Sequence, residues 1–275
     1  MKKKIQWNKI AVHITLIIGA LIVILPFYWM VVTSLKTNAE TMMIPPTLIP
    51  ENWQFSNYID VMKQFDFGTA YLNTAIVTVA RTLGQLLFCS MAAFAIATMR
   101  FPGRNVIFIM MISVLMFPPE MFMIPVYNLM NTINWLDTYY VLTVPIMASG
   151  FGIFLLRQFF MSLPRDLFEA ARMDGCSYFR IYWSIYMPLT IPGLVSLGIF
   201  VAVASWNDFL WPLIMTSSQD LQVVSIAIAS FVGEHNTNYA LMMAGSVISI
   251  LPLVLLYLFL QRYFIEGIAL TGVKG

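Results

Sequence analysis

Three charged side chains stand inside otherwise apolar stretches and are the first candidates for chemistry. They are Arg81, Glu120 and Asp208, and Asn207 lies beside the last of them. Within a membrane such groups are costly, face the interior of a helix bundle and usually pair. They can relay ions or protons, or they can hydrogen-bond the hydroxyl groups of a polar substrate on a translocation path. A structural pair of Arg81 with Glu120 or with Asp208 is equally open.

Residues for enzymatic or metal chemistry do not cluster in this sequence. His13 and His235 are isolated, and Cys89 and Cys176 belong to no CxxC pattern. The sequence contains no H-E-x-x-H pattern and no G-x-x-x-x-G-K-[ST] pattern. We therefore predict a non-catalytic chain that holds no metal, binds no cofactor itself and does not hydrolyse ATP alone.

The composition requires a lipid environment for whatever these side chains do. Of 275 residues, 60% are hydrophobic and only 10% are charged, whereas soluble domains have about 25% charged residues. So few charges cannot cover a water-exposed globule of this size. The net charge of +2 is too small to indicate a nucleic-acid partner. The predicted environment is a lipid bilayer.

Six apolar stretches reach the length of about 20 residues that a spanning helix needs. The first is longer than the apolar region of a signal peptide and lacks an A-x-A-like site, so we expect it to stay uncleaved. Pro118 and Pro119 should break the third. The predicted fold is all-α, with one transmembrane domain over 1–275 and spans at about 10–35, 71–99, 105–127, 138–156, 189–213 and 235–261.

The distribution of lysine and arginine predicts the orientation. With six spans and a cytoplasmic N-terminus, twelve basic residues fall in cytoplasmic segments and only Lys36 and Lys63 fall in outer loops. This is the bias expected of the cytoplasmic side. Both termini are therefore predicted to be cytoplasmic, in a multi-pass protein.

The segment 157–187 is the one sizeable cytoplasmic loop that this topology leaves. Leu167, Ala170 and Ala171 have the i, i+3, i+4 spacing of one helix face, and Gly175 permits a turn after the helix. We expect a short amphipathic helix that presents small residues to a cytoplasmic partner. The structural alternative is an ordinary solvated helix face.

This loop resembles the EAA motif of permease subunits in binding-protein-dependent ABC importers. The matching pattern is Glu169-Ala170-Ala171, three residues, Gly175, nine residues, Ile185, one residue, Met187 and Pro188, where the family usually has leucine in place of Met187. Further segments are similar to the maltose-permease-like branch that imports sugars: Phe154 to Phe160, Asp174-Gly175, Trp206 to Leu213, Gln261 to Phe264 and Gly272 to Gly275.

The resemblance implies a division of labour within a larger assembly. This chain would form half of a sugar path beside a second, different permease subunit, in a bacterial or archaeal cytoplasmic (inner) membrane. Two ATP-binding subunits would hold ATP and Mg, and an extracytoplasmic sugar-binding protein would deliver the sugar substrate. The loop would dock on an ATPase subunit, with Lys274 near the same interface, through Glu169, Ala170, Ala171, Arg172, Asp174, Gly175, Ile185 and Pro188.

The alternative class is an ion-coupled secondary transporter or channel that uses Arg81, Glu120 and Asp208. Such proteins commonly contain an inverted internal repeat, and no convincing repeat is visible in this sequence. That class also gives no reason for an EAA-type loop.

Overall fold

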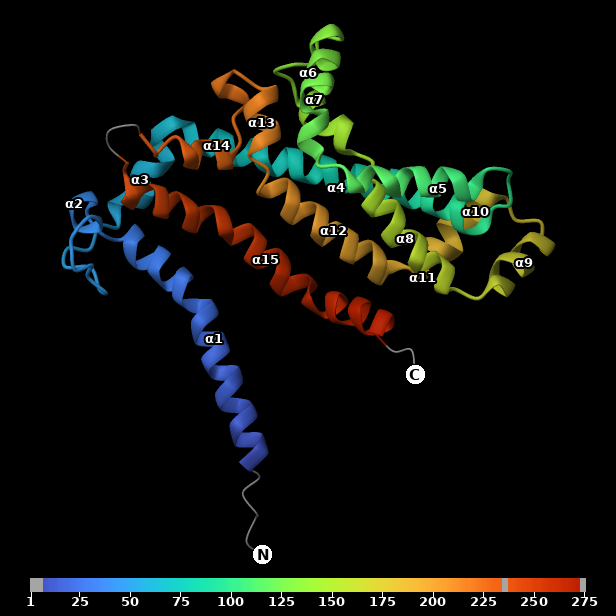
Figure 1. The fold of residues 1–275 in the computed structure, drawn as a ribbon, viewed down its shortest axis with the longest axis horizontal. Coiled ribbons are helices and arrows are strands. Elements are labelled where there is room, and N and C mark those ends of the chain that lie inside the picture. Colours follow the sequence, from blue (N-terminus) through green and yellow to red (C-terminus); the bar gives the residue numbers. More distant parts are fainter. Residues whose placement is uncertain (1–6, 234–236, 273–275) are drawn as a thin grey trace, which may run out of the picture. The chain divides into compact units, whose positions relative to one another are not determined.

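The chain forms helices joined by short connections (Figure 1). The computed structural model describes residues 7–233 and 237–272, and this part of the chain contains no β-strand. The predicted all-α class is therefore confirmed. Lys274 lies outside the described residues.

Three long helices correspond to the first, second and sixth predicted spans. They are α1 (Trp7–Ser34), α4 (Phe67–Thr98) and α15 (Tyr239–Gly272). Each contains an apolar stretch long enough to cross a membrane: Val12–Ser34, Phe67–Thr98 and Tyr239–Gln261. Continuous helix suits these segments, because only a helix satisfies its own backbone polar groups in lipid.

The other candidate spans are bent pairs of shorter helices. The first pair joins α5 (Arg104–Ser113) and η2 (Val114–Met116) to η3 (Pro119–Phe122) and α6 (Met123–Thr132), with a bend of 99°. The break falls at Pro118 and Pro119, as predicted. If each bent pair is one span, the described residues contain up to six spans.

The second and third pairs bend by 41° and 79°. The second joins α7 (Tyr139–Thr143) and η4 (Val144–Ile146) to α8 (Gly150–Ser162). The third joins α10 (Tyr178–Ile181), the π-helical turn η5 (Tyr182–Tyr186) and α11 (Met187–Leu189) to α12 (Ile191–Trp206).

Two expected boundaries differ from the structure. Helix α8 continues past Arg157 to Ser162, because a charged residue ends an apolar stretch but does not end a helix. The stop comes at Leu163, the residue before Pro164, where helical backbone is disfavoured. Helix α12 ends at Trp206, and the rest of the fifth stretch forms a separate helix, α13 (Leu210–Met215).

The chain divides into two compact units, and the first consists of 1–68 with 227–251. Here α2 (Asn38–Thr41), α3 (Ser56–Lys63) and η1 (Gln64–Asp66) occupy the long loop after α1. The side chain of Asn57 donates to the carbonyl oxygens of Ser34 and Lys36, both at 2.9 Å. Lys36 is buried and donates to the Thr47 carbonyl at 2.5 Å. The loop is thus fixed by polar contacts to its own backbone.

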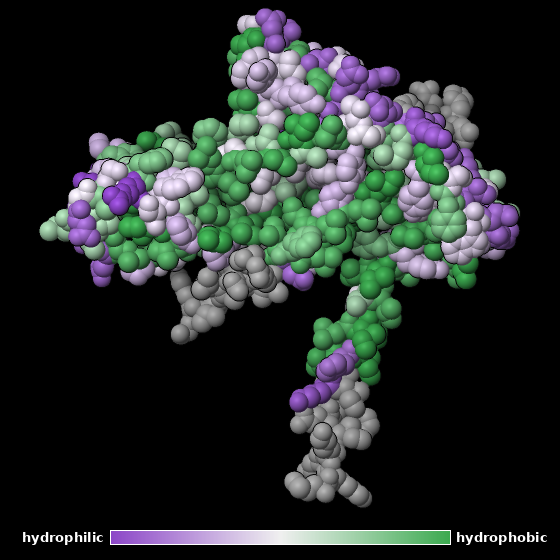
Figure 2. All heavy atoms as spheres, turned by 180° about the vertical axis from the view of Figure 1, so that it is seen from behind, coloured by the Kyte–Doolittle hydropathy of each residue, from purple (hydrophilic) through white to green (hydrophobic). Residues whose placement is uncertain are grey.

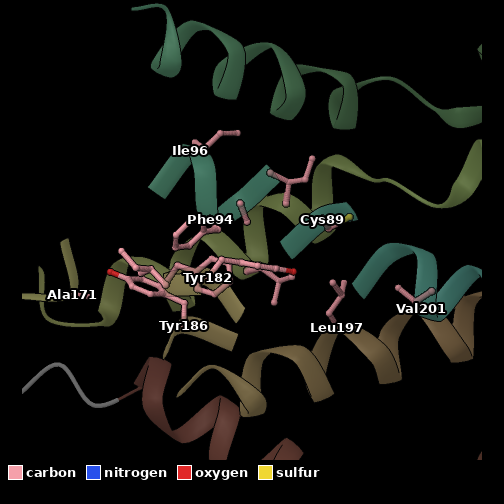
Figure 3. Close-up of a cluster of buried hydrophobic side chains, with 13 residues drawn as sticks. Cys89, Phe94, Ile96, Ala171, Tyr182, Tyr186, Leu197 and Val201 are labelled. Atoms are coloured by element: carbon pink, nitrogen blue, oxygen red, sulfur yellow. The ribbon is translucent and has the colours of Figure 1, made fainter. Parts of the chain in front are cut away.

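The second unit consists of 69–226 with 252–275 and contains the largest described core. Phe94 of α4 packs edge-on against Tyr186, with ring centroids 5.1 Å apart, and Tyr182 lies 5.4 Å away (Figure 3). The Tyr182 hydroxyl shares a 2.7 Å hydrogen bond with Ser90. We call the buried cluster around Phe94, Tyr182 and Tyr186 the aromatic core. The remaining elements are α9 (Arg165–Met173), η6 (Gln219–Leu221) and α14 (Val224–Ala229).

The face seen in Figure 2 carries broad apolar areas between polar patches. Along α1, the side chains of Leu16, Ile22 and Leu25 are each about two-thirds exposed. Water-soluble monomers rarely expose contiguous apolar patches larger than a few hundred Å². This surface is suited to lipid and to partner helices.

The predicted orientation can be tested with two exposed positions. We expect Leu48→Cys, which stands in the predicted outer loop, to react with a membrane-impermeant maleimide in intact spheroplasts. Met173→Cys, at the end of α9, should react only after permeabilisation. Both positions are well exposed, and both variants carry Cys176→Ala, while Cys89 is fully buried and can remain. The opposite labelling pattern would contradict a cytoplasmic N-terminus.

Candidate functional site

A buried ion pair joins α4 to the break between α12 and α13. Nη1 of Arg81 lies 2.7 Å from Oδ2 of Asp208, and the Arg81 side chain is only 2% exposed. Its Nε donates to the carbonyl oxygen of Leu142 at 2.5 Å. Of the two carboxylates that the sequence offered to Arg81, the structure selects Asp208.

Asp208 is held in place by its own neighbours. Its Oδ1 accepts a 3.4 Å hydrogen bond from the backbone N–H of Trp211, in the first turn of α13. The hydroxyl of Ser225 donates to the Asp208 carbonyl oxygen at 2.7 Å. The carboxylate and the backbone of Asp208 are thus each held by one neighbour besides Arg81.

A cavity of about 490 Å³ borders this pair. Its polar lining includes Arg81, Asp208, Gln85, Ser149 and Ser205. On its apolar side the rings of Phe151 and Phe200 meet edge to face, with centroids 5.7 Å apart. Aromatic rings with a few fixed polar groups are typical of small-molecule sites.

The other two candidates for the path lie apart from this cavity. Glu120 is exposed in η3, and no ion pair involves it among the described residues. The side chain of Asn207 is exposed and donates to the Val203 carbonyl at 2.8 Å, within its own helix end. The structure thus groups Arg81 with Asp208 and places neither Glu120 nor Asn207 among the cavity residues.

Sequence inspection missed three polar residues of the cavity, Gln85, Ser149 and Ser205. Gln85 lies one turn after Arg81 on α4, donates to the Ile146 carbonyl at 2.9 Å and accepts from Ser149 at 2.8 Å. The i, i+4 spacing of Arg81 and Gln85 was the available signal, because residues so spaced share a helix face. Ser149 carried no comparable signal.

The loop helix α9 ends in a turn that requires Gly175. The backbone N–H of Cys176 donates to Ala171 at 3.0 Å, and that of Gly175 donates to Arg172 at 3.1 Å. These two bonds form a Schellman motif. Gly175 has a φ of +79°, a left-handed conformation that glycine adopts without steric cost. The predicted turn is confirmed.

The exposed face of α9 differs from the expected one. Glu169 and Ala170 are exposed, but Ala171 is buried in the aromatic core (Figure 3). The expectation that both alanines face a partner is therefore corrected. Phe168 packs on the same core as Ala171, three residues earlier on the same face, and turns that face inward.

Of the other loop residues, Arg172 and Ile185 contact the rest of the loop or the core, whereas Asp174 and Pro188 are exposed. Arg172 donates to the Cys176 carbonyl at 3.0 Å and lies over the Tyr178 ring at 4.4 Å. Asp174 is exposed at the helix end, and Ile185 packs against the aromatic core. Pro188 is exposed in α11.

Comparison with known proteins gives matches over nearly the whole chain. Two relatives are named arabinooligosaccharides transport system permease protein AraQ. That of Halalkalibacterium halodurans is 34% identical over 93% of both chains, and that of Bacillus subtilis is 33% identical over 97% of this chain and 96% of its own. A third, the sn-glycerol-3-phosphate transport system permease protein UgpE of Pectobacterium atrosepticum, is 35% identical over 93% of this chain and 94% of its own.

Solved structures agree in fold. A chain of a bacterial ABC transporter involved in the import of the acidic polysaccharide alginate matches with a TM-score of 0.83 and 25% identity, over 96% of this chain and all of that one. A chain from the alginate transporter in complex with an alginate pentasaccharide-bound periplasmic protein matches with a TM-score of 0.64 and 16% identity, over 92% and 95%.

The family model described as binding-protein-dependent transport system inner membrane component matches residues 85–269. This range contains Gln85 of the cavity, Asp208 of the ion pair and the whole EAA-type loop, and proteins of this kind are transport components rather than enzymes. The chain is a permease of the binding-protein-dependent ABC transport family.

Proposed function

We propose that this chain is the transmembrane subunit of an ATP-driven sugar importer and forms half of its translocation path. It works with a second permease, two ATP-binding subunits that hold ATP and Mg, and an extracytoplasmic sugar-binding protein. It spans a bacterial or archaeal inner membrane six times, with both termini in the cytoplasm. The names of its relatives support this reading, because they concern oligosaccharide and glycerol phosphate transport and alginate import.

The observation that carries the proposal is the construction of α9. An EAA-type sequence stands on a short helix whose outer residues Glu169 and Ala170 are exposed, while Ala171 is buried in the aromatic core. The aromatic core also contains Phe94 of α4 and Leu197 of α12. A push on α9 by an ATPase subunit would therefore pass directly to candidate spans, since close-packed interiors transmit displacement.

The cavity beside Arg81 is the proposed sugar path within this subunit. Sugar hydroxyl groups need donors and acceptors, and Gln85, Ser149 and Asp208 supply both. The edge-to-face pair of Phe151 and Phe200 offers an apolar surface for a sugar ring. Glu120 and Asn207, which lie outside this cavity, remain proposed path residues for another stage of transport, and Lys274 remains a proposed contact of the ATPase subunits.

Replacement of Gly175 tests the docking loop. We expect Gly175→Val to reduce sugar uptake more than tenfold and to release the ATPase subunit during purification. A β-branched residue in left-handed backbone is strained by about 1–2 kcal/mol, although nothing lies within 4 Å of an added Cβ. Uptake and ATPase retention are measured in parallel with the amount of inserted chain.

Gly175→Asn is the matched control, because asparagine tolerates left-handed backbone. It should retain most of the uptake and the ATPase subunit. Normal sugar uptake by the Gly175→Val variant would contradict the proposal that this loop docks on an ATPase subunit.

Neutralising one or both members of the ion pair distinguishes a role in protein stability from a role in transport. Asp208→Asn leaves the buried Arg81 without a counter-ion, so we expect a loss of about 3 kcal/mol in stability, seen as a lower denaturation temperature of the purified complex. Arg81→Gln with Asp208→Asn should recover much of that stability. If the pair lines the path, uptake by the double variant stays low. Uptake that returns together with stability would make the pair a packing element.

A further inference from the structure

A second cavity, of about 320 Å³, lies among the ends of α4 and α8, the start of α5, and α9. Its charged lining consists of four arginines and one carboxylate: Arg100, Arg104, Arg157, Arg165 and Glu169. The cavity near Arg81 shares no lining residue with it. One lining residue, Glu169, also belongs to the exposed outer face of α9, but neither that face nor the Arg81–Asp208 pair accounts for four arginines in one cavity.

Two of the four guanidinium groups, those of Arg104 and Arg157, have positioning contacts, and none of the four is neutralised by a described carboxylate. Arg104 donates to the Met99 carbonyl at 3.1 Å, and the guanidinium of Arg157 lies 4.0 Å over the Phe108 ring. The Nε of Arg157 is buried and has no hydrogen-bond partner. Among the described residues, no carboxylate lies within 4.0 Å of any of the four arginines.

Electrostatics favours an anion in this cavity. Four like charges repel one another, and the one carboxylate in the lining cannot balance them. An anion with several oxygens would accept from more than one guanidinium at once and relieve the repulsion. Phosphate has this geometry, because its oxygens match the planar donors of arginine in bidentate pairs.

The position of the cavity indicates where such a phosphate comes from. Arg100 lies between α4 and α5, Arg104 is the first residue of α5, and Arg157 lies in the second half of α8, so all three are near ends of candidate spans. An exposed apolar side chain, that of Met161, belongs to the lining itself. Basic pockets between spans at the cytoplasmic side are suited to anionic lipid headgroups.

We propose that this cavity binds a phosphate group, supplied by an anionic phospholipid of the leaflet that α9 faces. The lipid phosphate enters among Arg100, Arg104 and Arg157, with its acyl chains along the exposed apolar side chains nearby. The proposal uses the proposed orientation to choose the cytoplasmic leaflet and does not depend on ATP coupling.

The test titrates phosphatidylglycerol into the full complex, purified in phosphatidylcholine nanodiscs, and counts bound phosphatidylglycerol by native mass spectrometry. Arg100→Gln with Arg104→Gln removes two of the three arginines that the proposal places around the phosphate. Lys63→Gln with Arg180→Gln removes two exposed positive charges elsewhere and is the matched control. We expect the cavity variant to bind phosphatidylglycerol about tenfold more weakly and the control to bind as the parent does.

A second arm titrates inorganic phosphate alone. Saturable phosphate binding as tight as that of the lipid, and lost in the cavity variant, would keep the phosphate site and assign it to a free phosphate compound. Equal lipid binding by the cavity variant and the control would overturn the proposal. So would loss of the ATPase subunit from the cavity variant with unchanged lipid binding, because the arginines would then serve an acidic protein segment.

The two proposals fail separately in this experiment. A parent complex that purifies without an ATPase subunit contradicts the proposed function, while the lipid titration can still be read on the isolated full chain.

Discussion

The second unit depends on one constraint: backbone groups released by a broken helix in a membrane must find partners inside the protein. Helix α4 supplies those partners from a stripe of polar side chains. Asn73 donates to the carbonyls of Asp220 and Gln222, and the Thr74 hydroxyl accepts from the N–H of Val224. Further along α4, Arg81 and Gln85 donate to the carbonyls of Leu142 in α7 and Ile146 just before the bend of the second pair. These polar side chains thus satisfy backbone groups of the irregular segments.

The same helix connects the cavity to the loop. Arg81 and Phe94 are thirteen residues apart on α4, roughly 20 Å along a continuous helix. Arg81 faces the polar cavity, and Phe94 belongs to the aromatic core that holds Ala171 of α9. Helix α4, which is 32 residues long, thus contributes Arg81 to the proposed substrate path and Phe94 to the core that holds the proposed docking helix. Coupling between the two needs no long chain of intermediates, because a single element contacts both.

Sequence reasoning was accurate where one physical property decides the outcome. Apolar length placed the three long helices, paired prolines placed the break before η3, and glycine placed the turn after α9. It was less accurate where rotation about a helix axis matters. Hydropathy does not say which face of α9 turns inward, because Ala170 and Ala171 are identical in type and only the packing of Phe168 and the tyrosines distinguishes them. Likewise, the choice of Asp208 over Glu120 as the partner of Arg81 depends on tertiary contacts between segments far apart in sequence.

The arginines illustrate why charge counts alone mislead in such a chain. A count by topology treats Arg100, Arg104 and Arg157 as equivalent marks of the cytoplasmic side. A topological role requires only that the charges stay in water, so any exposed position would serve. Here Arg157 is partly withdrawn from water, stacked on an aromatic ring and left with a buried donor unpaired. Such an arrangement costs free energy unless an acceptor arrives. An acceptor that is abundant at the ends of spanning helices would offset the cost of the unpaired Arg157 Nε. Lipid phosphate is such an acceptor.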